Sequence, residues 1–105
     1  MYSSGSNNLT GNTVTNNSWY GIRLLSSSNN IIYNNYLGNT NNAYDPCTNT
    51  WNTTKTAGEN IVGGSYLGGN YWSGYTGSDG DGDGLGDTPY LIPGGSNRDY
   101  LPLLV

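Results

Sequence analysis

The chain has 105 residues, a net charge of −4, three Lys and Arg, one Cys, and neither His nor Phe. So short a chain forms one small domain at most, and a hydrophobic content of 33% is too low for a thick globular core. Because phosphate contacts need clustered cations, the few Lys and Arg argue against nucleic acid and anionic membranes as partners.

Short repeated segments make up the first two thirds of the chain. An offset of 22 residues places Asn8 on Asn30, and an offset of 30 residues places Asn30 on Asn60. In each copy an apolar residue follows the Asn. A period near 22 residues is too short for a helix pair and is typical of one coil of a parallel β-helix. The sequence therefore predicts an all-β fold, a short right-handed parallel β-helix of about three coils.

The repeat predicts two stacks of side chains that run from coil to coil. Amides stacked at strand spacing bond to the coils above and below, and apolar side chains beside them form a narrow interior. Ile22 and Leu24 alternate like a further strand of the first coil. A conventional antiparallel sandwich also fits the strand lengths, but it does not explain the repeated Asn. The expected stacks are Asn8, Asn30 and Asn60, and Leu9, Ile31 and Ile61.

The repeat ends near residue 69, and the two parts of the chain are expected to differ in role. Residues 1–69 are assigned to the coils, with an insertion loop near residues 45–54 that accounts for the longer second offset. Residues 70–105 are rich in aromatic and apolar side chains but do not repeat. Because a solenoid needs an atypical unit to cover its last coil, this segment is predicted to be a C-terminal cap.

Four of the seven acidic residues lie in one glycine-rich loop, residues 79–87. The order Asp-x-Asp-x-Asp-Gly-x-x-Asp matches the start of an EF-hand-type calcium loop, but Tyr90 stands where that loop carries a bidentate Glu. Oxygen ligands without a nearby His favour a hard cation, and a flexible loop suits Ca²⁺ better than Mg²⁺. A solvated acidic turn without a metal is the alternative. The predicted ligands are the carboxylates of Asp79, Asp81, Asp83 and Asp87, the carbonyl of Leu85, and the carboxylate of Asp99.

Four segments carry a resemblance to a known family: residues 60–64 (NIVGG), 69–73 (GNYWS), 81–90 (DGDGLGDTPY) and 99–103 (DYLPL). Together they resemble the C-terminal end of NosD-like parallel β-helix proteins, which are common among secreted and cell-surface proteins of methanogenic archaea. The resemblance implies the β-helix fold. Members of this family include surface-layer and adhesion-type proteins, sugar-related binding proteins and a maturation factor for a copper enzyme, so the resemblance does not name a function.

No cap is recognisable ahead of Asn7, so the first coil is expected to expose an open backbone edge. Open edges recruit partners, so either the chain is a piece of a longer β-helix or chains self-associate through this coil. Stacking that does not close gives a filament, whereas first coil against first coil gives a dimer. The main interpretation is an extracellular structural protein of the cell surface, stabilised by bound calcium.

Several signals bear on location. Asn8, Asn16 and Asn52 begin glycosylation sequons and favour an extracellular address. Cys47 is the single Cys, so the chain cannot form an internal disulfide. No apolar run is long enough to span a membrane, and no membrane insertion is expected.

The residues do not suit catalysis. Parallel β-helices include calcium-dependent lyases that use Lys or Arg as a base, but Arg23 and Lys55 have no second carboxylate nearby in the sequence. An enzyme is therefore not expected. The alternative function is a carbohydrate-binding or adhesion module of a larger surface β-helix, because Trp19 and Tyr20 offer flat faces to sugar rings of glycans.

Overall fold

The computed structural model describes residues 3–105, and every regular element in this range is a short β-strand. The strands are short because Asn, Ser and Gly, which favour turns, interrupt the apolar residues every few positions. No helix that could cross a membrane occurs in this range. In chain order the strands are β1 (Asn8–Thr10), β2 (Thr13–Thr15), β3 (Ile22–Arg23), β4 (Ile31–Tyr33), β5 (Tyr36–Gly38), β6 (Ala43–Tyr44), β7 (Thr56–Ala57), β8 (Tyr66–Leu67), β9 (Tyr71–Trp72), β10 (Tyr90–Leu91) and β11 (Arg98–Asp99).

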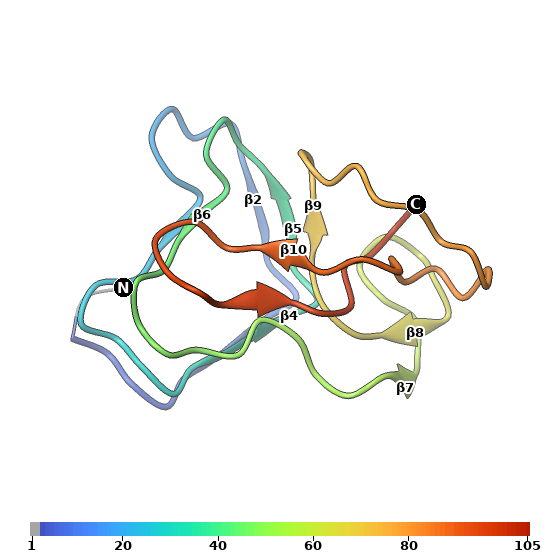
Figure 1. Cartoon of the computed structure of the whole chain (residues 1–105), viewed down its shortest axis with the longest axis horizontal. Helices are drawn as coiled ribbons and strands as arrows, with labels where there is room; N and C mark the ends of the chain where they lie inside the picture. Colours follow the sequence, from blue (N-terminus) through green and yellow to red (C-terminus); the bar gives the residue numbers. More distant parts are fainter. Residues whose placement is uncertain (1–2) are drawn as a thin grey trace.

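Successive turns of the chain lie on one another with their strands parallel. β1 pairs with β4, and β3 pairs with β6. β5 lies between β2 and β9, as Figure 1 shows. A parallel bridge between Ile31 and Thr50 adds a third layer to the β1–β4 pair. We call these layers the first coil (residues 3–28), the second coil (residues 29–48) and the third coil (residues 49–72).

The chain turns many of its corners at a residue with left-handed backbone geometry. Gly has no Cβ to hinder this conformation, and Asn tolerates it better than most residues. An Asn that bonds to the next coil follows each of these residues directly, so a turn residue and an Asn form a repeated corner unit. Five such corners have φ between 57° and 72°: Ser6, Gly11, Asn16, Asn29 and Asn34.

The Asn residues that follow the corners form ladders, but one residue away from the predicted register. Asn7, rather than Asn8, lies against Asn30: its backbone N–H and Nδ2 donate to Asn30 Oδ1 at 2.9 and 3.1 Å. Asn60 joins no ladder, because its side chain bonds to residues 62–66 of its own turn. The predicted stack of Asn8, Asn30 and Asn60 is therefore wrong. The observed ladders are Asn7–Asn30–Asn49, Asn12–Asn35–Asn70 and Asn17–Asn39–Asn42.

The shift in register also changes which apolar side chains face inward. Leu9 lies opposite Ile32, and the side chain of Ile32 is completely buried. Ile31, which was predicted to stack on Leu9, is 40% exposed. Side chains alternate between the two faces of a strand, so a slip of one residue exchanges the inner and outer sets. The predicted apolar stack of Leu9, Ile31 and Ile61 is therefore wrong.

Aromatic rings fill the interior of the stack at the third coil. The ring centroids of Trp51 and Trp72 lie 5.5 Å apart, and Tyr90 stacks on Trp72 at 4.3 Å. Because Tyr90 comes from the C-terminal part of the chain, that part packs on the same core as the coils. The buried core residues are Ile22, Leu24, Ile32, Leu37, Ala43, Trp51, Trp72 and Ile92.

The third coil contains a long excursion. Thr50 pairs with the second coil, and pairing resumes at Tyr71, so residues 52–69 leave the stack and hold the antiparallel pair β7–β8. The sequence suggested an insertion near residues 45–54, whereas the register places the extra residues after Trp51. β9 lies in the segment that was predicted to be the cap, yet it pairs with β5 and belongs to the third coil.

Residues 84–105 lie over the third coil and over the end of the second coil. The backbone N–H of Leu103 donates to the carbonyl of Asn70 at 2.9 Å. Leu85, Ile92 and Leu103 are buried, and β10 and β11 form an antiparallel hairpin in the same segment. The C-terminal end of the stack is therefore covered by protein.

Candidate functional site

Three carboxylates of the acidic loop converge. Oxygen atoms of Asp79, Asp81 and Asp87 lie within 4.8 Å of one another. Gly82 and Gly84, with φ of 73° and 83°, allow the tight turn that brings them together. The N–H of Gly84 donates to Asp79 Oδ2 at 2.7 Å and fixes that side chain. Carboxylate oxygens at this spacing are suited to a hard cation such as Ca²⁺.

Asp83 lies in the same loop but has a different partner. Its Oδ2 accepts from Lys55 Nζ at 2.9 Å, and it is not one of the three converging carboxylates. The hydrogen bond from Lys55 lowers the pKa of Asp83 to about 2. Hydrogen bonds to Asp79 and Asp83 raise the pKa of Asp81, as expected for crowded carboxylates that share a proton. In this structure Lys55 therefore binds a carboxylate that was predicted to be a metal ligand.

Leu85 joins the acidic loop to the end of the chain. Its side chain is buried, and its backbone forms an antiparallel bridge with Leu103. Its N–H donates to Asp83 Oδ1 at 2.9 Å. The order of the acidic loop is therefore linked to the segment that covers the third coil.

Asp99 lies at the end of an Asn ladder and not among the loop carboxylates. It is fully buried, and its Oδ2 accepts from the Asn70 backbone N–H at 2.7 Å and from Trp72 Nε1 at 2.8 Å. Its Oδ1 accepts from the Leu101 N–H at 3.0 Å. Burial raises the pKa of Asp99 to about 6 and outweighs these donors. The predicted role as a calcium ligand is therefore wrong, because both oxygens bind N–H groups of the core.

A second buried carboxylate has the same arrangement. Asp45 accepts from Asn49 Nδ2 at 2.9 Å and from Trp51 Nε1 at 2.8 Å. Asn97, from the C-terminal part of the chain, donates its Nδ2 to Asp45 Oδ2 at 2.8 Å. Two of the three ladders therefore end on a buried Asp that also binds a Trp indole. The sequence did not predict the contacts of Asp45 and Asp99 with these residues, because their partners are distant in the sequence or fall outside any repeat.

The first coil exposes positions that the second coil buries. Leu9 and Val14 are only half-buried, whereas Ile32 and Leu37, which lie opposite them, have no exposed surface. Leu9, Val14 and Ile22 line a surface hollow of about 410 Å³. The apolar interior of the stack is therefore open at this end.

Trp19 and Tyr20 lie together near the first coil, as the sequence suggested. The Trp19 side chain is 66% exposed, and its ring centroid lies 5.9 Å from that of Tyr20 at an interplanar angle of 35°. The Arg23 guanidinium carbon lies 5.0 Å from the Trp19 centroid. The tilted rings and the cation form a cluster that can contact a polar ligand, although they do not form one flat surface.

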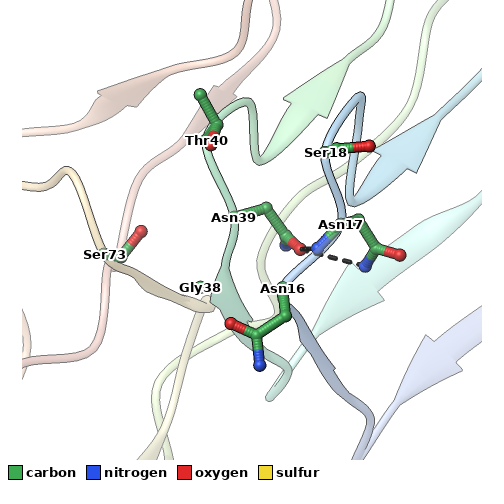
Figure 2. Close-up of a pocket in the computed structure, with 7 residues that line it drawn as sticks. All are labelled: Asn16, Asn17, Ser18, Gly38, Asn39, Thr40 and Ser73. Atoms are coloured by element: carbon green, nitrogen blue, oxygen red, sulfur yellow. Dashed lines mark hydrogen bonds between the residues drawn. The ribbon is translucent and has the colours of Figure 1, made fainter.

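A polar hollow lies beside the third ladder. Its volume is about 490 Å³, and its lining consists of Asn, Ser, Thr and Gly. Figure 2 shows Asn17 and Asn39 joined there, with Asn17 Nδ2 donating to Asn39 Oδ1 at 2.9 Å. No aromatic side chain lines it, so it offers hydrogen bonds to a ligand but no surface for stacking.

The sequons and the cysteine lie in different surroundings. Asn8 and Asn16 are exposed, whereas Asn52 is half-buried and its Nδ2 donates to the carbonyl of Thr53 at 3.2 Å. Cys47 is a free, half-buried thiol whose sulfur accepts from the Ser27 N–H at 3.4 Å.

Comparison with known proteins gives one match. The model of a family described as periplasmic copper-binding protein (NosD) matches residues 1–77. No curated protein and no solved structure matches the chain. The family has a parallel β-helix fold, which agrees with the parallel layers described above. Because the match covers most of the sequence, the chain belongs to the NosD family.

Proposed function

We propose that the chain is a non-catalytic structural protein of the cell envelope or surface that attaches to a partner through its open first coil. The contrast in burial between Val14 and Leu37 carries this proposal, because the two side chains hold equivalent positions in adjacent coils. A periplasmic family description supports a location outside the cytoplasm. Attachment would cover the apolar side chains of Leu9 and Val14 that the first coil exposes in part.

The two ends of the stack support attachment at one end only. Residues 84–105 cover the third coil, so head-to-tail growth at this end would have to displace them. A filament is therefore not part of the proposal. Self-association through first coils stays a prediction that sedimentation of the purified chain can test.

We also propose that the acidic loop binds Ca²⁺ through Asp79, Asp81 and Asp87. These carboxylates converge, and without a cation they repel one another. Because Leu85 bridges to Leu103, an ion in the loop would stabilise the segment that closes the stack.

Copper, which the family description names, does not fit the donors of this chain. Copper sites in proteins use imidazole, thiolate and thioether ligands. The chain has no His, one Cys and one Met. Cys47 accepts a hydrogen bond from Ser27 and lies apart from the acidic cluster, and Met1 is outside the described residues. We therefore propose no copper site.

Cell fractionation tests the attachment. A tagged chain in its source cell should be recovered with the envelope, and Val14→Lys should release it by placing a charge on the open face. Thr76→Lys, at an exposed position in the C-terminal part, is the matched control and should stay bound. Thermal melting of each purified variant separates loss of attachment from loss of fold. Native chain in the cytoplasm, or a folded Val14→Lys chain that stays attached, would contradict the proposal.

Calorimetric titration tests the metal. Ca²⁺ should bind to the native chain and raise its melting temperature, and Asp81→Asn should weaken binding at least about tenfold by removing one of three charged ligands. Glu59→Gln removes an exposed acid outside the loop and should leave binding unchanged. Tight Cu²⁺ binding without Ca²⁺ binding would contradict the assignment.

Carbohydrate binding is the second candidate, favoured by the exposed Trp19 ring beside Arg23. Titration of the purified chain with oligosaccharides tests it. Binding that is lost in Trp19→Ala and kept in Trp19→Tyr would support an adhesion module. No change in Trp fluorescence with any oligosaccharide would exclude a role for this cluster.

A further inference from the structure

Each Asn ladder has a direction. In all six links, the backbone N–H and Nδ2 of one Asn donate to the Oδ1 of the next Asn toward the C-terminal end. Asn12, for example, donates both groups to Asn35 Oδ1 at 3.0 Å. Asn30 and Asn35 therefore accept from the preceding coil and donate to the following one, whereas Asn39 accepts from the preceding coil and donates to Asn42 of its own coil.

The C-terminal end of each ladder meets an acceptor. The Asn12–Asn35–Asn70 ladder ends on Asp99, and the Asn7–Asn30–Asn49 ladder ends on Asp45. An ionised carboxylate accepts hydrogen bonds and donates none, so no further amide can follow it in the same direction. The third ladder ends where Asn42 Nδ2 donates to Ser73 Oγ at 3.1 Å. Two of the three donor series are therefore closed by a carboxylate, and the third ends on a hydroxyl.

The N-terminal end of each ladder offers acceptors instead. Within residues 3–105, no donor reaches the Oδ1 of Asn7, Asn12 or Asn17, and all three residues are exposed. In the second coil the corresponding oxygen atoms each accept two N–H groups. The three acceptors lie on the same coil as the hollow that Leu9, Val14 and Asn12 line. The face therefore combines a narrow apolar surface with three unfilled acceptors.

We propose that this face binds the last coil of another parallel β-helix, one whose Asn residues, five positions apart, donate N–H groups to Asn7, Asn12 and Asn17. In this chain, donors five positions apart, Asn7 and Asn12, meet acceptors that are also five positions apart, Asn30 and Asn35. Such a coil would continue all three ladders and cover Leu9 and Val14 as the first coil covers Ile32 and Leu37. The inference rests on the proposed function and names the kind of partner that the open coil takes.

A second copy of this chain does not supply those donors. Its first coil presents the same three acceptors, so acceptor would face acceptor. At its other end two ladders finish on the buried Asp45 and Asp99, and the third finishes on Ser73. The direction of the ladders therefore selects a β-helix whose last coil lacks the terminal carboxylates.

An added coil tests the proposal in the full chain. A copy of residues 7–29 is inserted between Ser6 and Asn7. Each copied Asn then lies 23 residues before its original, which is the separation of Asn7 from Asn30. We expect the melting temperature to rise by about 5 °C or more. Hydrogen exchange of the original first-coil amides should slow at least about tenfold, because a covered strand opens less often.

The matched control carries Asp at the three copied Asn positions. Asp has nearly the same shape but lacks the Nδ2 donors and places a carboxylate against Oδ1, so this coil should give little or no protection. Equal protection by the two inserts, or an Asn insert that melts below the native chain, would overturn the proposal. A native dimer at micromolar concentration that Val14→Lys dissociates would also overturn it, since a second copy would then occupy the face. If Val14→Lys still releases the chain from cells, the attachment survives and only the partner chemistry fails.

Discussion

The first and second coils of the stack are built from the same residue types but differ in what covers them. At the N-terminal end, Val14 is half-buried and Asn12 keeps an open acceptor. One coil further on, Leu37 is completely buried and Asn35 is bonded on both sides. In a stacked fold, burial is thus a property of the neighbouring coil as much as of the residue itself. Variants at matched positions should reveal that difference.

Truncating matched apolar positions should give unequal losses. Leu37→Ala removes a fully buried side chain and should lower the free energy of unfolding by about 3 kcal/mol, whereas Val14→Ala should lower it by less than about 1 kcal/mol. Urea denaturation of the two variants measures both. Equal losses would mean that the first coil is covered in solution, and sedimentation would then show by what.

Stability should fall as pH rises from 4 to 6, because Asp99 is buried at the closed end. Its folded pKa of about 6 is above the usual value of 3.8, so between these values the folded state holds the proton more tightly. Ionisation of Asp99 therefore lowers the free energy of unfolding by about 2–3 kcal/mol across this window. Melting curves at several pH values measure it.

Asp99→Asn is the matched variant for that effect. The amide does not titrate, so the stability of this variant should depend much less on pH between 4 and 6. Glu59→Gln, at an exposed site, should keep the slope. If the native chain is flat in this window, another group compensates for Asp99 and the assignment of the slope is wrong.

Removing matched ladder amides from the first and second coils should also give unequal losses of stability. Asn35→Ala deletes side-chain bonds to Asn12 and Asn70 and leaves buried partners unpaired, which should reduce stability by about 2 kcal/mol. Asn12→Ala deletes bonds on one side only and should cost less than about 1 kcal/mol. Thermal denaturation at one pH compares them, and a larger effect at Asn12 would contradict the open end.

Replacing Lys55 should have the smallest effect on stability and a clear effect on the acidic loop. Lys55→Met removes the ion pair with Asp83, so the pKa of Asp83 should rise from about 2 toward its usual range. An exposed ion pair contributes less than about 1 kcal/mol, and Ca²⁺ should bind more tightly once the competing ammonium is gone. Carboxyl NMR titration and calorimetry measure these changes, and unchanged Ca²⁺ affinity would show that Asp83 does not assist the site.

The all-β class and the Asn-based repeat were predictable from the sequence, but the register was not read correctly. Ile31 and Ile32 are both apolar, so hydrophobicity alone does not decide which one faces inward. The spacing of the corner units does decide it. Asn7 and Asn12 lie five residues apart, as do Asn30 and Asn35, and only an offset of 23 residues superposes both pairs.

The carboxylates at the ladder ends could not be predicted in the same way. Asp99 meets Asn70 across 29 positions of sequence, and no repeat relates the two. The sequence assigned Asp99 to the acidic loop because a ligand was missing there, whereas its position follows from the fold of the C-terminal part. The convergence of Asp79, Asp81 and Asp87, by contrast, follows from local glycine turns.

The placement of the three tryptophans makes the protein its own optical probe. Trp51 and Trp72 are shielded from water and bonded to carboxylates at the closed end, whereas Trp19 is 66% exposed near the open one. Red-edge excitation and acrylamide quenching should therefore address Trp19 selectively, and the blue-emitting pair should report on the other end. Events at the two ends can be followed separately in unlabelled protein.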